Sequence, residues 1–218
     1  TEKKTDPRVA SRLLDNNPVN EDMNQAGELV DVAFGINIVV NTKSKHSKLF
    51  CGDFHDAWIK SCKYVDDCYG VPIEKEADIV IASCGGYPKD INLYQSTKSI
   101  FNAARAVKKG GTVIFLAECR EGGGAPDFFS WIEPLKRGVL DEELRANFTI
   151  GGYIFYALCE AIAKSKMLML SEIDPNFVKD LNINSYKNID ELLEKVDFEG
   201  KDVCVLPYGG SVVPLLQD

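Results

Sequence analysis

The hydrophobic pattern of the chain alternates between short apolar runs and longer segments of helical periodicity. Residues 79–82 form a continuously apolar run of strand length, and Gly85-Gly86-Tyr87-Pro88 follows as a sequence that interrupts regular structure. From Asn92 onward, apolar positions recur every three or four residues. They are Leu93, Thr97, Ile100, Phe101, Ala104 and Val107. This pattern predicts a buried strand, a loop, and a long helix that packs on a sheet.

The segment before this unit predicts a helix, a hairpin and a second helix. Asn20 is a suitable N-cap for the first helix, and period-two alternation over residues 34–41 predicts a strand. Residues 49–51 are expected to pair back on that strand as a hairpin. Asp53 is expected to cap the second helix. The side chains expected to be buried are Met23, Ala26 and Val30 in the first helix, and Phe54, Trp58, Cys62 and Val65 in the second.

Strand and helix patterns continue to alternate after the long helix, which Gly110-Gly111 is expected to end. A buried strand at 112–117 and a glycine-rich loop at 118–126 come next. The later expected elements are helices at 127–135, 141–147 and 152–163, a strand at 166–170, short helices near Pro175 and Asn188, and a strand at 202–207. This order predicts an α/β fold with a mainly parallel, doubly wound (Rossmann-like) sheet, helices on both faces, and the early hairpin as an antiparallel edge.

The two buried strands at 79–83 and 112–117 are expected to be parallel neighbours, because a single helix joins them. Carboxyl ends of parallel strands meet at one edge of a sheet. The glycine loops at residues 85–86 and 122–124 should therefore border one crevice. Gly209-Gly210-Ser211, after the last strand, either shapes the same rim or forms a simple turn.

Gln95 and Lys98 lie one helical turn apart near the start of the long helix. From there both side chains can point at the crevice, where they would hold a small anion. A glutamine and a lysine on a helix are also typical of a solvent-exposed face, and their spacing alone favours that simpler interpretation.

Composition sets limits on the class of protein. With 218 residues, 45% of them hydrophobic, the chain can bury a core as one domain, which we place at residues 18–218 after a polar connector at 1–17. The first residue is Thr1 rather than methionine, which agrees with a fragment and equally with removal of the first residue by processing. The 25 basic and 33 acidic residues give a net charge of -8, which disfavours a nucleic-acid partner. No apolar run reaches the roughly 20 residues of a membrane span, and no signal segment is expected at the start.

The remaining candidate sites favour structural interpretations. Seven cysteines without a Cys-x-x-Cys pair lie mostly in apolar runs, as reduced core residues of a cytoplasmic protein would. The glycines at 122–124 lack the Gly-x-Gly-x-x-Gly spacing of a dinucleotide site. His46 and His55 have no second ligand at metal-binding spacing, so no metal site is expected. Glu118 and Glu121 have no visible partner and are expected to be solvated.

A position-by-position match to a known family runs from Cys84 to Lys98. It is specific at Gly85-Gly86-Tyr87-Pro88, Asp90 and Tyr94-Gln95, and it continues through residues 108–114 and Ala117-Glu118-Cys119. In these residues the chain resembles the C-terminal domain of the lactate racemase family, the nickel-pincer 2-hydroxyacid racemases and epimerases. The resemblance extends over roughly residues 12–218.

The resemblance implies a substrate-site-completing domain of a 2-hydroxyacid racemase or epimerase, an isomerase that acts by reversible hydride transfer to a nickel-pincer cofactor. In this family an N-terminal domain carries the lysine that holds the cofactor, the histidine that binds nickel and the histidines that accept protons. Its characteristic stretches do not occur in this sequence. The chain is therefore expected to hold no cofactor, to be inactive alone, and to have that domain and a small 2-hydroxyacid as partners.

Three residues take roles from the resemblance. Lys98 would neutralise the substrate carboxylate, Gln95 would hydrogen-bond the carboxylate or the hydroxyl group, and Tyr94 would line the apolar side of the pocket. The alternative is a non-catalytic α/β module that binds a small carboxylate or a protein partner. An N-terminal histidine-rich domain in the same reading frame would favour the racemase.

Overall fold

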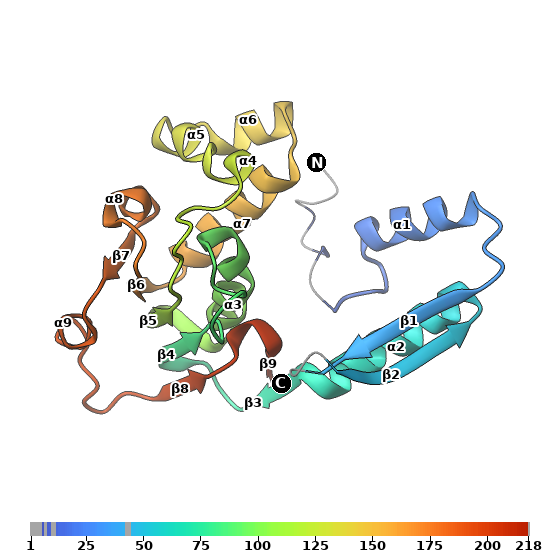
Figure 1. The fold of residues 1–218 in the computed structure, drawn as a ribbon, viewed down its shortest axis with the longest axis horizontal. Coiled ribbons are helices and arrows are strands. Elements are labelled where there is room, and N and C mark those ends of the chain that lie inside the picture. The colour runs from blue at the N-terminus through green and yellow to red at the C-terminus, as the bar shows by residue number, and fades with distance from the viewer. Residues whose placement is uncertain (1–5, 7, 10–11, 42–44, 218) are drawn as a thin grey trace. The chain divides into compact units, whose positions relative to one another are not determined.

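The computed structural model describes residues 6, 8–9, 12–41 and 45–217 (Figure 1). The chain divides into two compact units, residues 1–70 and 71–218. The sequence placed a boundary after residue 17 and none near residue 70. The boundary after residue 17 stays a prediction. The hydrophobic pattern did not predict the division after residue 70.

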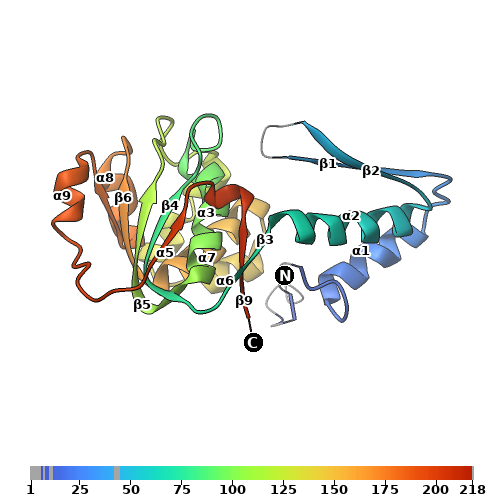
Figure 2. The ribbon, with the colours of Figure 1, turned by 90° about the horizontal axis from the view of Figure 1, so that it is seen from below.

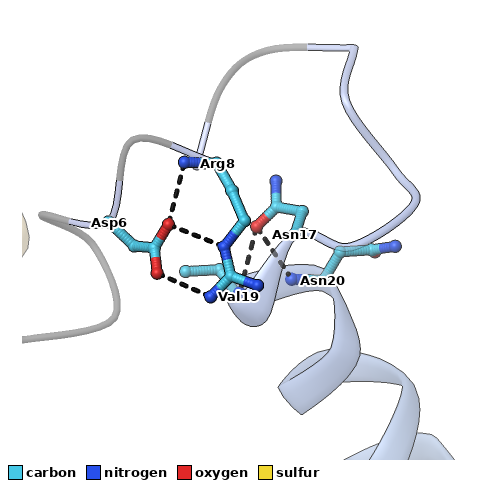
Figure 3. A network of polar contacts seen from close by, with 5 residues as sticks. All are labelled: Asp6, Arg8, Asn17, Val19 and Asn20. Atoms are coloured by element: carbon cyan, nitrogen blue, oxygen red, sulfur yellow. Dashed lines mark hydrogen bonds and ion pairs between the residues drawn. The ribbon is translucent and has the colours of Figure 1, made fainter.

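Unit 1 begins with α1 (Pro18–Glu28), whose N-cap is Asn17. The Asn17 side chain accepts hydrogen bonds from the backbone N–H groups of Val19 and Asn20 (Figure 3). The prediction of Asn20 as the cap was wrong, because Pro18 needs no hydrogen-bond acceptor for its nitrogen and fits the first helical position. Figure 3 also shows Arg8 paired with Asp6 just upstream, at 2.7 Å.

The predicted buried side of α1 was also wrong. The helix has no buried residue, and Met23 and Val30 are each 64% exposed. A periodic apolar pattern marks a helix, yet it does not guarantee that the described chain supplies a surface to cover it.

The early hairpin is formed by β1 (Gly35–Val40) and β2 (His46–Gly52), which pair antiparallel as predicted. It is a separate two-stranded sheet and not the edge of the main sheet, contrary to expectation. α2 (Phe54–Tyr69) packs against it. Asp53 caps α2 as predicted, accepting hydrogen bonds from two backbone N–H groups of the first turn.

The inward face of α2 is shifted from the predicted one. Ala57 and Ser61 are its buried residues, while Trp58 and Cys62 are half-buried. Val65 was predicted to face inward and is 38% exposed.

Unit 2 is built on a five-stranded parallel sheet with strand order β7-β6-β5-β4-β8 (Figure 1). The strands are β4 (Ala77–Ser83), β5 (Val107–Leu116), β6 (Lys166–Leu170), β7 (Ile183–Tyr186) and β8 (Val203–Leu206). The parallel pairing of β4 with β5 confirms the prediction, with Ile81 opposite Ile114. A further pair, β3 (Gly70–Ile73) and β9 (Val213–Leu216), forms its own small sheet.

The helices of unit 2 are α3 (Leu93–Ala106), α4 (Pro126–Phe129), α5 (Ile132–Lys136), α6 (Leu140–Ala146), α7 (Ile150–Ala163), α8 (Pro175–Val178) and α9 (Ile189–Leu193). Two short 3-10 turns, Lys179–Leu181 and Gly209–Ser211, complete the unit. The helix predicted at 127–135 is split into α4 and α5. Among the described residues, no helix has the length and apolar character needed to cross a membrane.

Both faces of the five-stranded sheet are covered, as the doubly wound prediction requires. α3 and α7 lie on one face of the sheet (Figure 2). Val80, Phe115 and Met169 are completely buried in the main core cluster. On the other face, α9 packs Leu192 against a smaller cluster that includes Ile114. Both faces of the sheet are thus covered, and the candidate site lies at the carboxyl ends of β4 and β5.

Candidate functional site

The loop after β4 is held against the loop after β5. The backbone N–H of Cys84 donates to the carbonyl oxygen of Leu116 at 3.1 Å, which extends the β4–β5 pairing past the end of the strand. Further on, the N–H of Cys119 donates to the carbonyl of Asp90 at 2.8 Å. The two loops therefore lie at the same edge of the sheet, as the sequence predicted.

The first residues of α3 form hydrogen bonds with the loop after β5. The N–H groups of Leu93 and Tyr94 donate to the carbonyl oxygens of Gly122 and Gly123 at 2.9 and 3.2 Å. The Asn92 side chain accepts the N–H of Gln95 at 3.0 Å, confirming Asn92 as the helix start. The first turn of a helix leaves N–H groups without intrahelical partners, and here the loop after β5 satisfies two of them.

The glycine-rich loop owes its composition to this close approach. A Cβ atom on Gly124 would lie 2.9 Å from the Asn92 side chain and 2.9 Å from the Cβ of Tyr94. Gly124 also has φ +95°, where a side chain is strained. A Cβ on Gly123 would lie 2.6 Å from the ring of Phe129. The glycines let the loop pack against the start of α3, which explains them without a nucleotide.

Asp90 is a buried carboxylate between the two loops, with 7% of its surface exposed. Its Oδ2 accepts the backbone N–H of Glu118 at 3.2 Å, while its Oδ1 is buried with no hydrogen-bond partner among the described residues. The sequence signalled Asp90 only as part of the matched motif. Its position shows that it joins the β4 loop to the β5 loop and so holds the start of α3.

We expect Asp90→Ala to destabilise unit 2 by about 1–3 kcal/mol, because the Glu118 N–H would stay buried without an acceptor. Asp90→Asn keeps a side-chain oxygen and should cost less. The midpoint of urea unfolding of both variants measures this difference. An alanine variant as stable as the wild type would show that the Asp90–Glu118 contact does not hold the loops.

The three predicted substrate residues lie on the first turns of α3, where their environments differ. Gln95 and Lys98 are exposed and lie one turn apart, and within the described residues neither side chain has a hydrogen-bond or ion-pair partner. Tyr94 is half-buried, with its ring 5.2 Å from that of Phe128. Phe128 in turn lies 5.5 Å from Phe155 in the core. An amide and an ammonium group beside an anchored aromatic ring can bind a small carboxylate.

A cavity of about 440 Å³ lies at the carboxyl edge of the sheet. Its polar lining comes from Ser83, Asp90, Glu118, Ser171, Glu172 and Lys187. Tyr94, Gln95 and Lys98 do not line it. Glu118 pairs with Arg120 at 2.6 Å and Glu172 with Lys187 at 3.5 Å, so these carboxylates already have cationic partners. Glu121, the other predicted solvated carboxylate, is exposed.

The rim segment Gly209–Ser211 is fixed from two sides. The Asn102 side chain donates to the carbonyl oxygen of Gly209 at 2.7 Å, and the Lys89 ammonium donates to the Ser211 hydroxyl at 3.1 Å. The sequence left open whether this segment shapes the rim. Its bonds to α3 and to the β4 loop favour that interpretation over a simple turn.

The cysteines of the site are buried thiols. Cys84 and Cys119 are each 1% exposed, and the Cys119 sulfur lies 3.6 Å from the Ser96 hydroxyl. Burial raises the pKa of Cys119 to about 11 and also raises the pKa of Cys84. Both thiols are therefore protonated at neutral pH and are poor nucleophiles.

We expect Cys84 and Cys119 to resist alkylation of the folded chain, whereas the exposed thiols of Cys51 and Cys68 react readily. Timed treatment with a maleimide at pH 7, followed by peptide mass spectrometry, measures each site. Rapid labelling of Cys119 without unfolding would contradict the burial described above.

The matched residues 108–114 have a structural role. The Lys108 ammonium donates to a carboxylate oxygen of Asp78 at 2.9 Å, and the other oxygen of Asp78 accepts the backbone N–H of Asp202 at 3.0 Å. The hydrogen bond from Lys108 holds the pKa of Asp78 below its usual range. This cluster links β4, β5 and the approach to β8 at the edge opposite the site.

The family model described as "Lactate racemase C-terminal domain" matches residues 73–214. The chain belongs to this family. The lactate racemase of Thermoanaerobacterium thermosaccharolyticum is 32% identical over 216 residues, which cover 95% of this chain and 50% of that protein. The lactate racemase of Lactiplantibacillus plantarum is 27% identical over 216 residues, covering 95% and 51%.

Solved structures agree with this membership. The lactate racemase apoprotein from Thermoanaerobacterium thermosaccharolyticum aligns with a TM-score of 0.88 and 31% identity, covering 98% of this chain and 53% of that chain. A protein from Thermotoga maritima aligns with a TM-score of 0.66 at 13% identity, covering 93% and 54%, and shows the fold alone. The chain thus spans about half the length of the curated lactate racemases that it matches.

Proposed function

We propose that this chain is the C-terminal, substrate-site-completing part of a 2-hydroxyacid racemase or epimerase. In the complete protein, an N-terminal domain outside this chain would hold a nickel-pincer cofactor that reversibly accepts a hydride from the substrate. The observation that carries the proposal is the match of unit 2 to the lactate racemase C-terminal domain family. All seven cysteines are free thiols, which supports a cytoplasmic location as part of the proposal.

The cofactor does not fit the residues of this chain. Among the described residues, no group of three or more His, Cys, Asp or Glu side chains is placed to hold a metal ion. His46 and His55 are exposed, on β2 and α2. In this proposal, which follows the family resemblance, nickel would be bound by the other part of the protein, and this chain's residues would act on the substrate.

The start of α3 supplies the substrate contacts in this proposal. The ammonium of Lys98 would pair with the carboxylate of the 2-hydroxyacid, and the Gln95 amide would hydrogen-bond the carboxylate or the hydroxyl group. The ring of Tyr94, anchored on Phe128, would cover the apolar side of the substrate. Support comes from the exposure of Gln95 and Lys98, which leaves both groups available to a ligand.

The test compares the isolated chain with the same chain joined to the N-terminal domain and loaded with cofactor, hereafter the assembled racemase. Chiral chromatography of lactate follows the interconversion of its D and L forms. We expect interconversion by the assembled racemase and none by the isolated chain. Lactate binding by the assembled protein without interconversion would instead favour the non-catalytic carboxylate-binding module.

A further inference from the structure

The hairpin of unit 1 carries most of its aliphatic side chains on the face that points away from α2. Ile36 stands opposite Cys51 and Ile38 opposite Leu49, so these four share one face of the hairpin. Val40 follows Ile38 by two residues and continues that face. Ile36 is 65%, Ile38 52% and Leu49 58% exposed. We call Ile36, Ile38, Val40, Leu49 and Cys51 the outer face.

The face toward α2 is the less apolar of the two. Its residues are Gly35, Asn37 and Val39 on β1 and Lys48, Phe50 and Gly52 on β2, so Val39 and Phe50 are its apolar side chains. Val39 is buried, and the half-buried Phe50 ring lies 5.6 Å from that of Tyr64 on α2. A Cβ on Gly35 would lie 2.6 Å from the Cα of Phe54, so the strand needs glycine where α2 begins. A strand with one covered face places its apolar residues on that face. In this hairpin the outer face has more apolar side chains than the face toward α2. This distribution is typical of a sheet whose outer face is also covered.

The described part of unit 1 offers nothing to cover the outer face. A two-stranded sheet requires a packed element for stability in water, and α2 supplies it on the other face of the hairpin. α1 has no buried residue, and Leu29 just after it is 87% exposed. Apolar side chains of the outer face and of the α1 region are therefore left exposed in the described part of unit 1.

We propose that the outer face is an interface that packs against the half of the polypeptide that the lactate racemases carry outside the stretch matched here. Those proteins have about as many residues again as this chain matches. The family model begins at residue 73, so unit 1 lies outside the C-terminal domain that it describes. The outer face holds aliphatic side chains and one thiol, with the His46 imidazole opposite Val40 at one end, and so fits an apolar helix or sheet face of that half. The proposal rests on the proposed function only in requiring such a half.

Cys51 gives a direct probe of this interface. Cys51 on the outer face and Cys68 on α2 are both exposed thiols. The added protein is the half of the Thermoanaerobacterium thermosaccharolyticum lactate racemase that lies outside its match to this chain. When it is present in excess, we expect maleimide labelling of Cys51 to slow roughly tenfold or more, while labelling of Cys68 keeps its rate.

Two variants separate this interface from adventitious association. Ile38→Glu places a charge on the outer face and should abolish the protection of Cys51. Val205→Glu, at a similarly exposed strand position in unit 2, should leave it intact. Circular dichroism confirms that both variants are folded.

The remaining outcomes overturn the proposal. Unchanged labelling of Cys51 would do so, and so would protection that grows with the concentration of this chain alone, because a second copy would then be the occupant. The measurement involves no substrate or cofactor. Protection of Cys51 without racemisation by the assembled racemase would refute the proposed function and leave the interface standing.

Discussion

Replacing Lys98 with alanine is expected to lower kcat/KM of the assembled racemase roughly tenfold to hundredfold. In the proposed site the variant would lose a charge-assisted hydrogen bond to the substrate carboxylate, worth about 1.5–3 kcal/mol. Stability should change little, because Lys98 is exposed on α3 and alanine is a good helix former. Racemisation rates and melting temperatures of the variant measure both effects.

Two further variants test whether the loss of activity is specific to the proposed substrate site. Gln95→Ala should weaken the enzyme in the same direction by a smaller factor, because the lost hydrogen bond is uncharged. Lys109→Ala should behave as wild type: Lys109 is an exposed residue near the start of β5, away from the carboxyl edge where the site lies. A Lys98 variant as active as the Lys109 variant would mean that Lys98 is only a solvated residue of the helix.

Replacing Phe128 with alanine is expected to destabilise unit 2 by about 3–5 kcal/mol. Phe128 is completely buried and lies between Tyr94 of the site and Phe155 of the core. Its removal leaves a cavity and frees the Tyr94 ring, so turnover should fall even where the protein stays folded. Urea unfolding gives the stability change, and racemisation below the unfolding transition gives the effect on the site.

Phe177→Ala is the matched control for this substitution. Phe177 is 46% exposed and contacts Phe129 at the surface, so its loss should cost less than about 1 kcal/mol. Equal destabilisation by the two substitutions would contradict the role of Phe128 as the support of Tyr94.

The central part of the fold could be predicted because its signals are local. The apolar run of β4, the glycine interruption and the Asn92 cap fall within twenty residues of one another, and each has one dominant structural meaning. β3, β7 and β9 were missed because each has only four residues and is interrupted by proline or by polar side chains, whereas β8, equally short, is a continuous apolar run. The buried side of α1 could not be predicted, because burial depends on which surface meets the helix.

Some features of the candidate site could be predicted from the sequence, and others depend on contacts between distant residues. Tyr94, Gln95 and Lys98 were found through their match to a family, since a glutamine and a lysine on a helix carry little information alone. The role of Asp90 depends on its bond to Glu118, 28 residues away in the chain, and no local pattern announces such a contact. The need for glycine at residue 124 likewise follows from the packing of Asn92 and Tyr94 against it.

The most direct test of the proposed site is a crystal structure of the assembled racemase with lactate bound. The account predicts the Lys98 ammonium within about 2.7–3.2 Å of a lactate carboxylate oxygen, with the Gln95 amide on the same carboxylate or on the hydroxyl group. Lactate bound in the complete protein with its carboxylate held by other residues, and Lys98 directed into solvent, would contradict it.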